Sequence, residues 1–256
     1  MEYFVVFIFG AIIGSFLNVC IYRMPLGKSI VLPPSHCPFC GRLIRWFDNV
    51  PVLSYIVLLG KCRSCGRKIP FRYPLVELLA AFSGAGLLRF FPMGPVFIVY
   101  WGFVLALITV SFIDFETQEI PDIITLPGIV IGIGMVTFFN ILGDEGRLGA
   151  FFDSLLGVLA GGGVMFLMGF FGEMIFRKEA LGGGDVKLMA MAGAFLGWKL
   201  VILAFFLAPF FGAGVGIFMK IKFKSEVIPY GPYLAMASII SLLWGGEIIS
   251  YLFPFQ

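Results

Sequence analysis

Residues 95–116 read PVFIVYWGFVLALITVSFIDFE, and they indicate what kind of protein this is. The stretch 95–113 carries no charged residue, and it ends at a carboxylate, Asp114. An α-helix needs about 20 apolar residues to cross the hydrocarbon layer of a bilayer. We therefore predict a transmembrane helix over 95–113, with Asp114 at one edge of the membrane.

The composition of the whole chain agrees with a membrane protein. Of its 256 residues, 60% are hydrophobic and 13% are charged, and the mean hydropathy is +1.02. Soluble domains carry about 25% charged residues, so an ordinary soluble enzyme and a disordered chain are excluded. The formal net charge of +3 is too small to indicate a nucleic-acid partner. The expected surroundings are the lipid bilayer.

Seven further apolar runs predict an all-α polytopic membrane protein with about eight transmembrane helices. The eight runs cover residues 3–22, 74–91, 95–113, 123–142, 150–176, 186–198, 200–219 and 231–253. The run 186–198 is short for a full crossing. We divide the chain into a first transmembrane helix at 1–22, a polar loop at 23–73 and a seven-helix membrane core at 74–256.

The distribution of Lys and Arg predicts the orientation, because cytoplasmic loops of membrane proteins are rich in these residues. Nine of the 18 Lys and Arg residues lie in the loop 23–73, which we place in the cytoplasm. Alternating crossings then bring fifteen of them to the cytoplasmic side and three, Arg89, Arg147 and Lys199, to the other. Both termini are expected outside, with Asp114 at the cytoplasmic edge.

The polar loop contains two C-x-x-C pairs whose spacing is typical of a zinc ribbon. The four residues are Cys37, Cys40, Cys62 and Cys65, and a glycine follows each pair. Four thiolates close a tetrahedral structural site, and a loop of this size buries too little apolar area to fold without such a staple. Two disulfides or four idle thiols are the alternatives, and a reducing cytoplasm argues against disulfides. His36 is expected to be a bystander.

Two aspartates are the candidates for chemistry, because ionisable residues at membrane depth are costly and therefore usually functional. Asp114 ends one predicted helix, and Asp185 begins another after a run of three glycines at 182–184. The predicted topology puts both at the cytoplasmic edge, where two carboxyls could share a proton as in aspartic proteases. Alternatively, Asp185 caps a helix and Asp114 only lines an interface. Asp122 is expected to cap the helix that follows it.

A set of motifs in matching order resembles the bacterial prepilin peptidases, the leader peptidases of type IV pilins and type II secretion pseudopilins. The similarity covers nearly the whole chain. The motifs are Gly14-Ser15-Phe16-Leu17-Asn18-Val19, Tyr22-Arg23-Met24-Pro25, the two Cys pairs, Asp48-Asn49-Val50-Pro51, Arg72-Tyr73-Pro74-Leu75-Val76-Glu77, Asp114 with Ile120-Pro121-Asp122, Gly182-Gly183-Gly184-Asp185 with Lys187-Leu188, and Tyr230-Gly231-Pro232.

The resemblance implies an inner-membrane aspartyl endopeptidase that cleaves the basic leader from prepilins or pseudopilins, with Asp114 and Asp185 as its catalytic residues. It also implies N-methylation of the new N-terminus with S-adenosylmethionine. No methyl-donor motif is apparent in the sequence, so that activity rests on the resemblance. The donor site is expected between the first two helices and the Cys loop. The candidate residues there are Glu77, Lys61 and Arg72, together with Asn18 and Arg23.

The turn 114–122 is a candidate for substrate binding. It carries Asp114, Glu116, Glu119 and Asp122 and no cation, so Glu116 and Glu119 could attract a basic leader. Gly182, Gly183 and Gly184 could admit its extended backbone. Two other classes of function remain open at this point. One is an ion-coupled transporter that uses the buried acids, and the other is a non-catalytic scaffold for pilus assembly.

Overall fold

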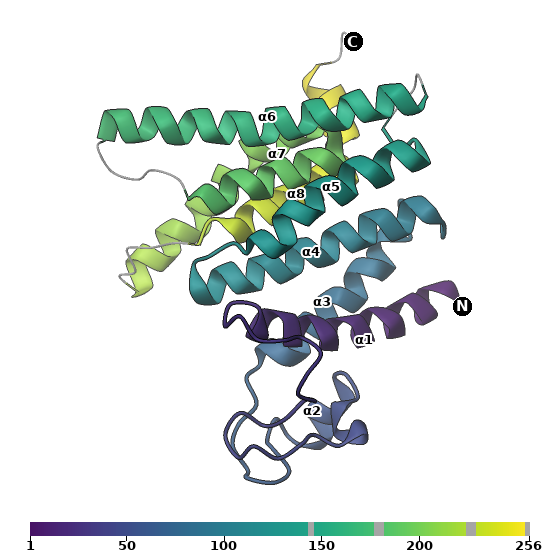
Figure 1. Ribbon diagram of the computed structural model, residues 1–256, viewed down its shortest axis with the longest axis vertical. Helices are drawn as coiled ribbons and strands as arrows, with labels where there is room; N and C mark the ends of the chain where they lie inside the picture. The colour runs from purple at the N-terminus through teal and green to yellow at the C-terminus, as the bar shows by residue number, and fades with distance from the viewer. Residues whose placement is uncertain (143–145, 177–181, 224–228, 254–256) are drawn as a thin grey trace. The chain divides into compact units, whose positions relative to one another are not determined.

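The computed structural model describes residues 1–142, 146–176, 182–223 and 229–253, and side chains within 215–223 are not considered (Figure 1). The described chain is almost entirely helical, with two isolated β-bridges in the polar loop. Two compact units divide it, residues 1–93 and residues 94–256. Each unit is considered by itself below.

The first unit joins two helices through small residues. These helices are α1 (Glu2–Arg23) and α3 (Arg72–Leu87), and glycines on α1 let the two backbones approach closely. A Cβ atom at Gly10 would lie 2.6 Å from the Cα of Ala81, and one at Gly14 would lie 2.6 Å from the Cα of Glu77. Such small-residue contacts are a usual way of packing helices in membranes. Between them lies the polar loop, with a 3-10 helix η1 (Trp46–Asn49) and a short helix α2 (Leu53–Val57).

The second unit consists of five helices whose bounds follow the predicted apolar runs. They are α4 (Pro95–Thr117), α5 (Asp122–Phe139), α6 (Arg147–Phe176), α7 (Gly183–Phe223) and α8 (Gly231–Leu252). Helix α4 ends where Gln118 adopts a left-handed conformation, with φ of 56°, and its N–H donates to the carbonyl of Asp114. That ending holds Asp114 in the last turn of α4.

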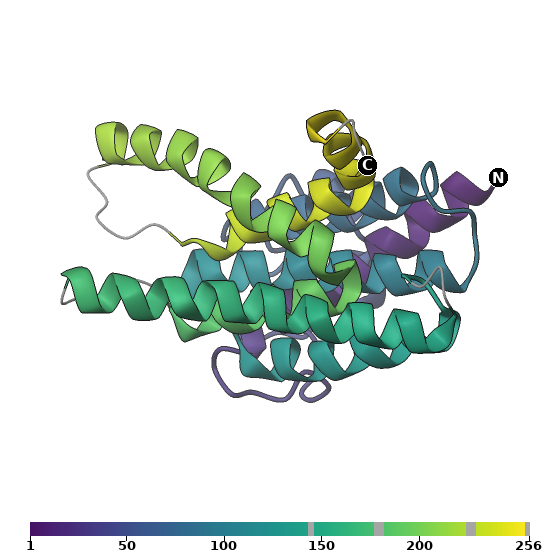
Figure 2. The same ribbon diagram turned by 90° about the horizontal axis from the view of Figure 1, so that it is seen from above.

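Helix α7 is interrupted at Gly197, where the chain reverses. Gly197 has φ of 74° and ψ of 173°, a conformation outside the helical region. Gly161 of α6 faces both Met189 and Val201, and these two would be about 18 Å apart along a straight helix. The two parts of α7 therefore run back alongside each other, and the second part passes beside α8 (Figure 2). This agrees with the two separate runs predicted at 186–198 and 200–219.

As a result, helix ends that are far apart in the sequence gather at one edge of the second unit. The end of α4 and the starts of α5, α7 and α8 all lie on the left side of the unit in Figure 1. The opposite edge holds the end of α5, the start of α6 and the end of α8. The reversal lies at this edge too, because a Cβ atom at Gly197 would lie 3.2 Å from Leu142, just after α5.

Six helices in the described part of the chain are long and apolar enough to cross a membrane, namely α1, α4, α5, α6, α7 and α8. Helix α3 is shorter, at 16 residues, and α7 counts as one helix in this set although it reverses. The prediction of an all-α, multi-pass membrane protein is confirmed, and eight is an approximate helix count.

Candidate active site and metal centre

Asp114 is buried in the last turn of α4, where the start of α8 contacts it. Its side chain is 5% exposed, and the backbone N–H of Gly231 donates to its Oδ2 atom over 2.9 Å. A Cβ atom at position 231 would lie 2.7 Å from that oxygen, so the contact requires a glycine. The Tyr230-Gly231-Pro232 motif thus places a backbone donor directly on the Asp114 carboxyl.

Asp185 lies in the first turn of α7 and is half-buried. The backbone N–H of Gly182 donates to its carboxyl, which therefore turns back over the start of the helix. Asp185 is also close enough to Asp114 to interact with its charge. The two carboxyls that the sequence singled out thus lie on two helix ends of the same unit, the last turn of α4 and the first turn of α7.

Tyr230 is a further residue at this edge, and the sequence motif alone gave it no role. It directly precedes α8, and its ring lies near that of Tyr233, with 6.4 Å between the centroids. Burial, and then the charge of Asp185, raise the pKa of the Tyr230 phenol. The phenol therefore stays protonated at neutral pH beside the Asp185 carboxyl.

The three glycines before Asp185 have different surroundings. Gly182 and Gly183 are exposed, and nothing lies within 4 Å of where a Cβ atom of Gly183 would be. A Cβ atom at Gly184 would lie 2.8 Å from the Cβ of Ile120. Gly184 therefore lets the turn before α5 approach α7, whereas Gly183 borders open space.

The acidic turn lies at the same edge. Glu116 is in the last turn of α4, Glu119 follows that helix, and both side chains are exposed. Asp122 does not cap α5, and that prediction is wrong. The N-cap position is Pro121, no side chain caps the helix, and the Asp122 carboxylate instead accepts hydrogen bonds from Lys187 Nζ, 2.7 Å from each of its oxygens.

The four predicted cysteines form one cluster in the polar loop. The Sγ atoms of Cys37, Cys40, Cys62 and Cys65 all lie within 4.8 Å of one another, and those of Cys37 and Cys65 are 3.9 Å apart. Two sulfurs on a tetrahedral zinc ion are about 3.8 Å apart, given Zn–S bonds of about 2.3 Å. The cluster can therefore hold a metal ion. His36 is not part of it, and its Nδ1 atom lies 3.0 Å from the carbonyl oxygen of Pro34.

Two matching turns build this cluster. The Gly41 N–H donates to the carbonyl of Cys37 and the Gly66 N–H to that of Cys62, each over 2.9 Å. Both glycines have positive φ, 69° and 70°, as expected for such turns. Backbone N–H groups of Cys65 and Ser64 lower the pKa of Cys62 to about 7. The Cys62 thiol therefore ionises more readily than a free cysteine, whereas the pKa of Cys65 in the same cluster is raised to about 11.

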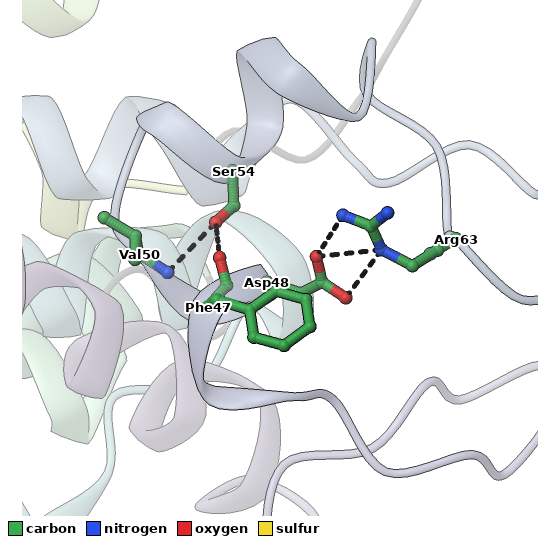
Figure 3. A network of polar contacts seen from close by, with 5 residues as sticks. All are labelled: Phe47, Asp48, Val50, Ser54 and Arg63. Atoms are coloured by element: carbon green, nitrogen blue, oxygen red, sulfur yellow. Dashed lines mark hydrogen bonds and ion pairs between the residues drawn. The ribbon is translucent and has the colours of Figure 1, made fainter.

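A polar network attaches the second Cys turn to η1 (Figure 3). Arg63 donates from Nε to both oxygens of Asp48 and from Nη2 to Oδ1, at 2.7–3.0 Å. This guanidinium holds the pKa of the Asp48 carboxyl below its usual range. The Ser54 hydroxyl accepts from the Val50 N–H and donates to the Phe47 carbonyl, both over 3.0 Å. The network ties the Asp48–Pro51 motif to the second Cys turn.

The candidate methyl-donor residues occupy different environments in the first unit. Glu77 is 7% exposed, and its carboxylate accepts a hydrogen bond from the Val52 N–H over 2.7 Å. Val52 itself has a positive φ of 61°. Lys61 is exposed at the second Cys turn, and the Arg72 guanidinium lies over the ring of Tyr73.

The other two candidates, Asn18 and Arg23, are buried and donate to backbone carbonyls. Glu77 is thus the buried acid among the five, and it connects α3 to the polar loop.

Comparisons with known proteins agree with these features. Residues 8–90 match the family model described as the bacterial peptidase A24 N-terminal domain, and residues 101–217 match the type IV leader peptidase family. Relatives named prepilin leader peptidase/N-methyltransferase include one from Aeromonas hydrophila, 35% identical over 95% of this chain and 91% of the relative. A relative from Pseudomonas aeruginosa is 36% identical over 93% of this chain and 89% of its own length. A relative from Myxococcus xanthus is 41% identical over 83% of this chain and 62% of its own length. No solved structure matches the chain.

Proposed function

The chain belongs to the type IV leader peptidase family, and we propose on this basis that Asp114 and Asp185 are the two catalytic residues of its peptidase reaction. It is an enzyme with two activities, prepilin leader cleavage and N-methylation. It resides in the bacterial inner membrane as a multi-pass protein. Nothing in the relatives favours a transporter or a passive scaffold.

The observation that carries the catalytic proposal is that Asp114 and Asp185 lie on helix ends that packing joins, since Gly231 contacts Asp114 and Gly184 contacts Ile120. Two carboxyls that share a site do not both ionise readily, so as a catalytic pair they would hold one proton. The ionised member takes a proton from the attacking water, and the protonated member gives its proton to the leaving amine. The Gly231 N–H orients Asp114 for this exchange. Cleavage of a prepilin by variants at these two positions tests the proposal.

We place this edge and the Cys loop on the cytoplasmic side, with both termini outside. The support is the distribution of Lys and Arg described above. In this orientation, a prepilin or pseudopilin whose apolar helix lies in the membrane presents its basic leader at the height of the aspartates.

The Cys cluster is proposed to hold one zinc ion with a structural role. Four thiolates leave no position for water or substrate, so the ion would stabilise the loop without taking part in cleavage. The sulfur separations support this assignment.

S-adenosylmethionine is proposed as the methyl donor, and Glu77 is proposed as a residue of its site. Lys61 and Arg72, which precede and follow the second Cys turn in the sequence, are the other candidates. The donor carries a positive sulfonium and an ammonium group. A buried carboxylate such as Glu77 is a suitable partner for a cation.

Glu77→Gln is expected to lower methylation at least about tenfold and to leave leader cleavage within about twofold, because it removes the charge but keeps an oxygen that can accept the Val52 N–H. The size corresponds to losing about 1.4 kcal/mol of a charged hydrogen bond. The measurement is the mass of the mature product. Glu77→Ala, which also removes the acceptor for Val52, is the comparison. If the Gln variant methylates normally and only the Ala variant fails, Glu77 supports the loop and does not bind the donor.

We also propose that the acidic turn recruits the basic leader through Glu116 and Glu119. Exposed charge pairs contribute about 0–1 kcal/mol each, so Glu116→Gln with Glu119→Gln is expected to raise KM about two- to fivefold and to leave kcat nearly unchanged. Salt should reduce the difference, because it screens exposed charges. The test is steady-state cleavage of a basic-leader prepilin at low and high ionic strength.

A matched double neutralisation at the opposite edge of the same unit, Asp153→Asn with Glu247→Gln, serves as the control and should not change KM. If KM at low ionic strength is the same for the acidic-turn variant and for the unmodified protein, the turn does not recruit the leader.

A further inference from the structure

The ion pair between Asp122 and Lys187 joins the two sequence motifs that carry the proposed catalytic residues. Asp122 follows the turn after Asp114, and Lys187 lies two residues after Asp185. The Lys187 Nζ atom is 2.7 Å from both oxygens of Asp122, across 65 residues of sequence. Because one ammonium group bridges both oxygens, the contact fixes the direction of both side chains.

This pair belongs to a row of contacts that runs along α5 and the first part of α7. Further along, a Cβ atom at Gly128 would lie 2.9 Å from the Cγ of Met191, and one at Gly132 would lie 2.8 Å from the Cβ of Ala194. The contacts advance in the same direction along both helices. They keep α5 and α7 parallel and close, and the ion pair continues this alignment to the edge where Asp185 lies.

The start of α7 has few side chains of its own to pack, although α6 contacts its backbone, since a Cβ atom at Gly162 would lie 3.7 Å from the Val186 carbonyl oxygen. Residues 182–184 are glycines, which offer no side chains for packing and lose much conformational freedom when they are ordered. Two contacts from the segment before and at the start of α5 reach this turn. Ile120 packs against Gly184, and Asp122 binds Lys187. Asp185 lies between these two contact points.

We propose that the Asp122–Lys187 ion pair is a positioning element, which holds the first turn of α7 so that the Asp185 carboxyl faces Asp114. The proposal rests on the assignment of Asp114 and Asp185 as the catalytic pair. In this role, neither Asp122 nor Lys187 contacts the substrate. Both are partly exposed, 53% and 39%, which limits the size of the effect.

A double-mutant cycle on cleavage of a purified prepilin tests this role. Asp122→Asn and Lys187→Gln are each expected to lower kcat about three- to fivefold, the size that an exposed ion pair supports, with KM changed less than twofold. The double variant should be no slower than either single variant, because both remove the same interaction. Lys187→Arg should retain most of the activity, since its guanidinium can still bind both oxygens.

Lys199→Gln, on the same helix beyond the reversal at Gly197, is the control and should behave as the unmodified protein. Unchanged kcat in both single variants overturns the proposal, and so does a double variant whose loss is the product of the two. A change confined to KM also overturns it, because it would place the pair in substrate binding. Asp185→Asn, measured in the same assay, distinguishes a failure of the catalytic assignment from a failure of the positioning role. If it stays active, the catalytic assignment fails, whereas an inactive Asp185→Asn with normal Asp122→Asn rejects the positioning role alone.

Discussion

Asp114→Asn and Asp185→Asn should each slow prepilin cleavage by about 10²–10⁴-fold, the usual contribution of a general acid or base. Asn has nearly the shape of Asp but cannot exchange a proton, so the protein should still insert and fold. The Gly231 N–H can still donate to an amide oxygen at position 114. The measurement is the rate at which a purified prepilin shortens on a gel, with membrane insertion checked in the same preparation.

Asp153→Asn is the matched control, because Asp153 belongs to the same unit but lies at the opposite edge, near Gly197. It should cleave at the normal rate. Full cleavage by either Asn variant at 114 or 185 would reject the catalytic pair. Gly231→Ala adds an independent probe. Its methyl group would lie 2.7 Å from Asp114 Oδ2, so cleavage should fall although no carboxyl is lost.

Purified protein should contain about one zinc ion per chain, and Cys37→Ser or Cys62→Ser should remove it. Binding of structural zinc is worth about 10–16 kcal/mol in small peptides, so the loop should lose its structure without the ion. Elemental analysis gives the zinc content, and limited proteolysis reports whether the loop is folded. Prepilin cleavage should partly survive, since no cysteine is assigned to the chemistry.

His36→Ala provides the comparison for the metal site. His36 neighbours Cys37 in sequence but lies outside the sulfur cluster, so its variant should keep the full zinc content. A metal-free preparation with a protease-resistant loop would show that the four thiols need no ion. Zinc that persists in both Cys→Ser variants would mean that other ligands hold it.

The fold could largely be predicted from the sequence because a bilayer imposes simple length and polarity requirements on each crossing. Even the reversal in α7 was indicated by the break between the predicted runs 186–198 and 200–219, which falls two residues after Gly197. The Cys cluster was predictable for a similar reason, since each C-x-x-C turn is local and its geometry follows from a few residues. The sequence also placed Asp114 and Asp185 at one membrane edge, but the distance between their carboxyls could not be predicted from it.

Contacts between distant segments could not be predicted in this way. The capping role expected for Asp122 followed a local preference, and that preference lost to a lysine 65 residues away. The need for glycine at 184 and 231 likewise comes from Ile120 and Asp114, which reach them only in the folded chain. Tyr230 stood in a recognised motif, but only the packing of α8 brought its phenol under the influence of Asp185.

The reversal at Gly197 has a consequence for hydration. The part of α7 that carries Asp185, residues 183–196, rises only about 21 Å, which is less than the roughly 30 Å of a bilayer's hydrocarbon layer. At least one of its ends therefore lies below the membrane surface, where free backbone groups need water. The Gly197 end is buried in protein, whereas the Gly182–Gly183 end is exposed. The Gly197 end can therefore lie below the surface, while the exposed end that carries Asp185 stays at the surface, where water, the second substrate of a hydrolysis, reaches the peptide bond.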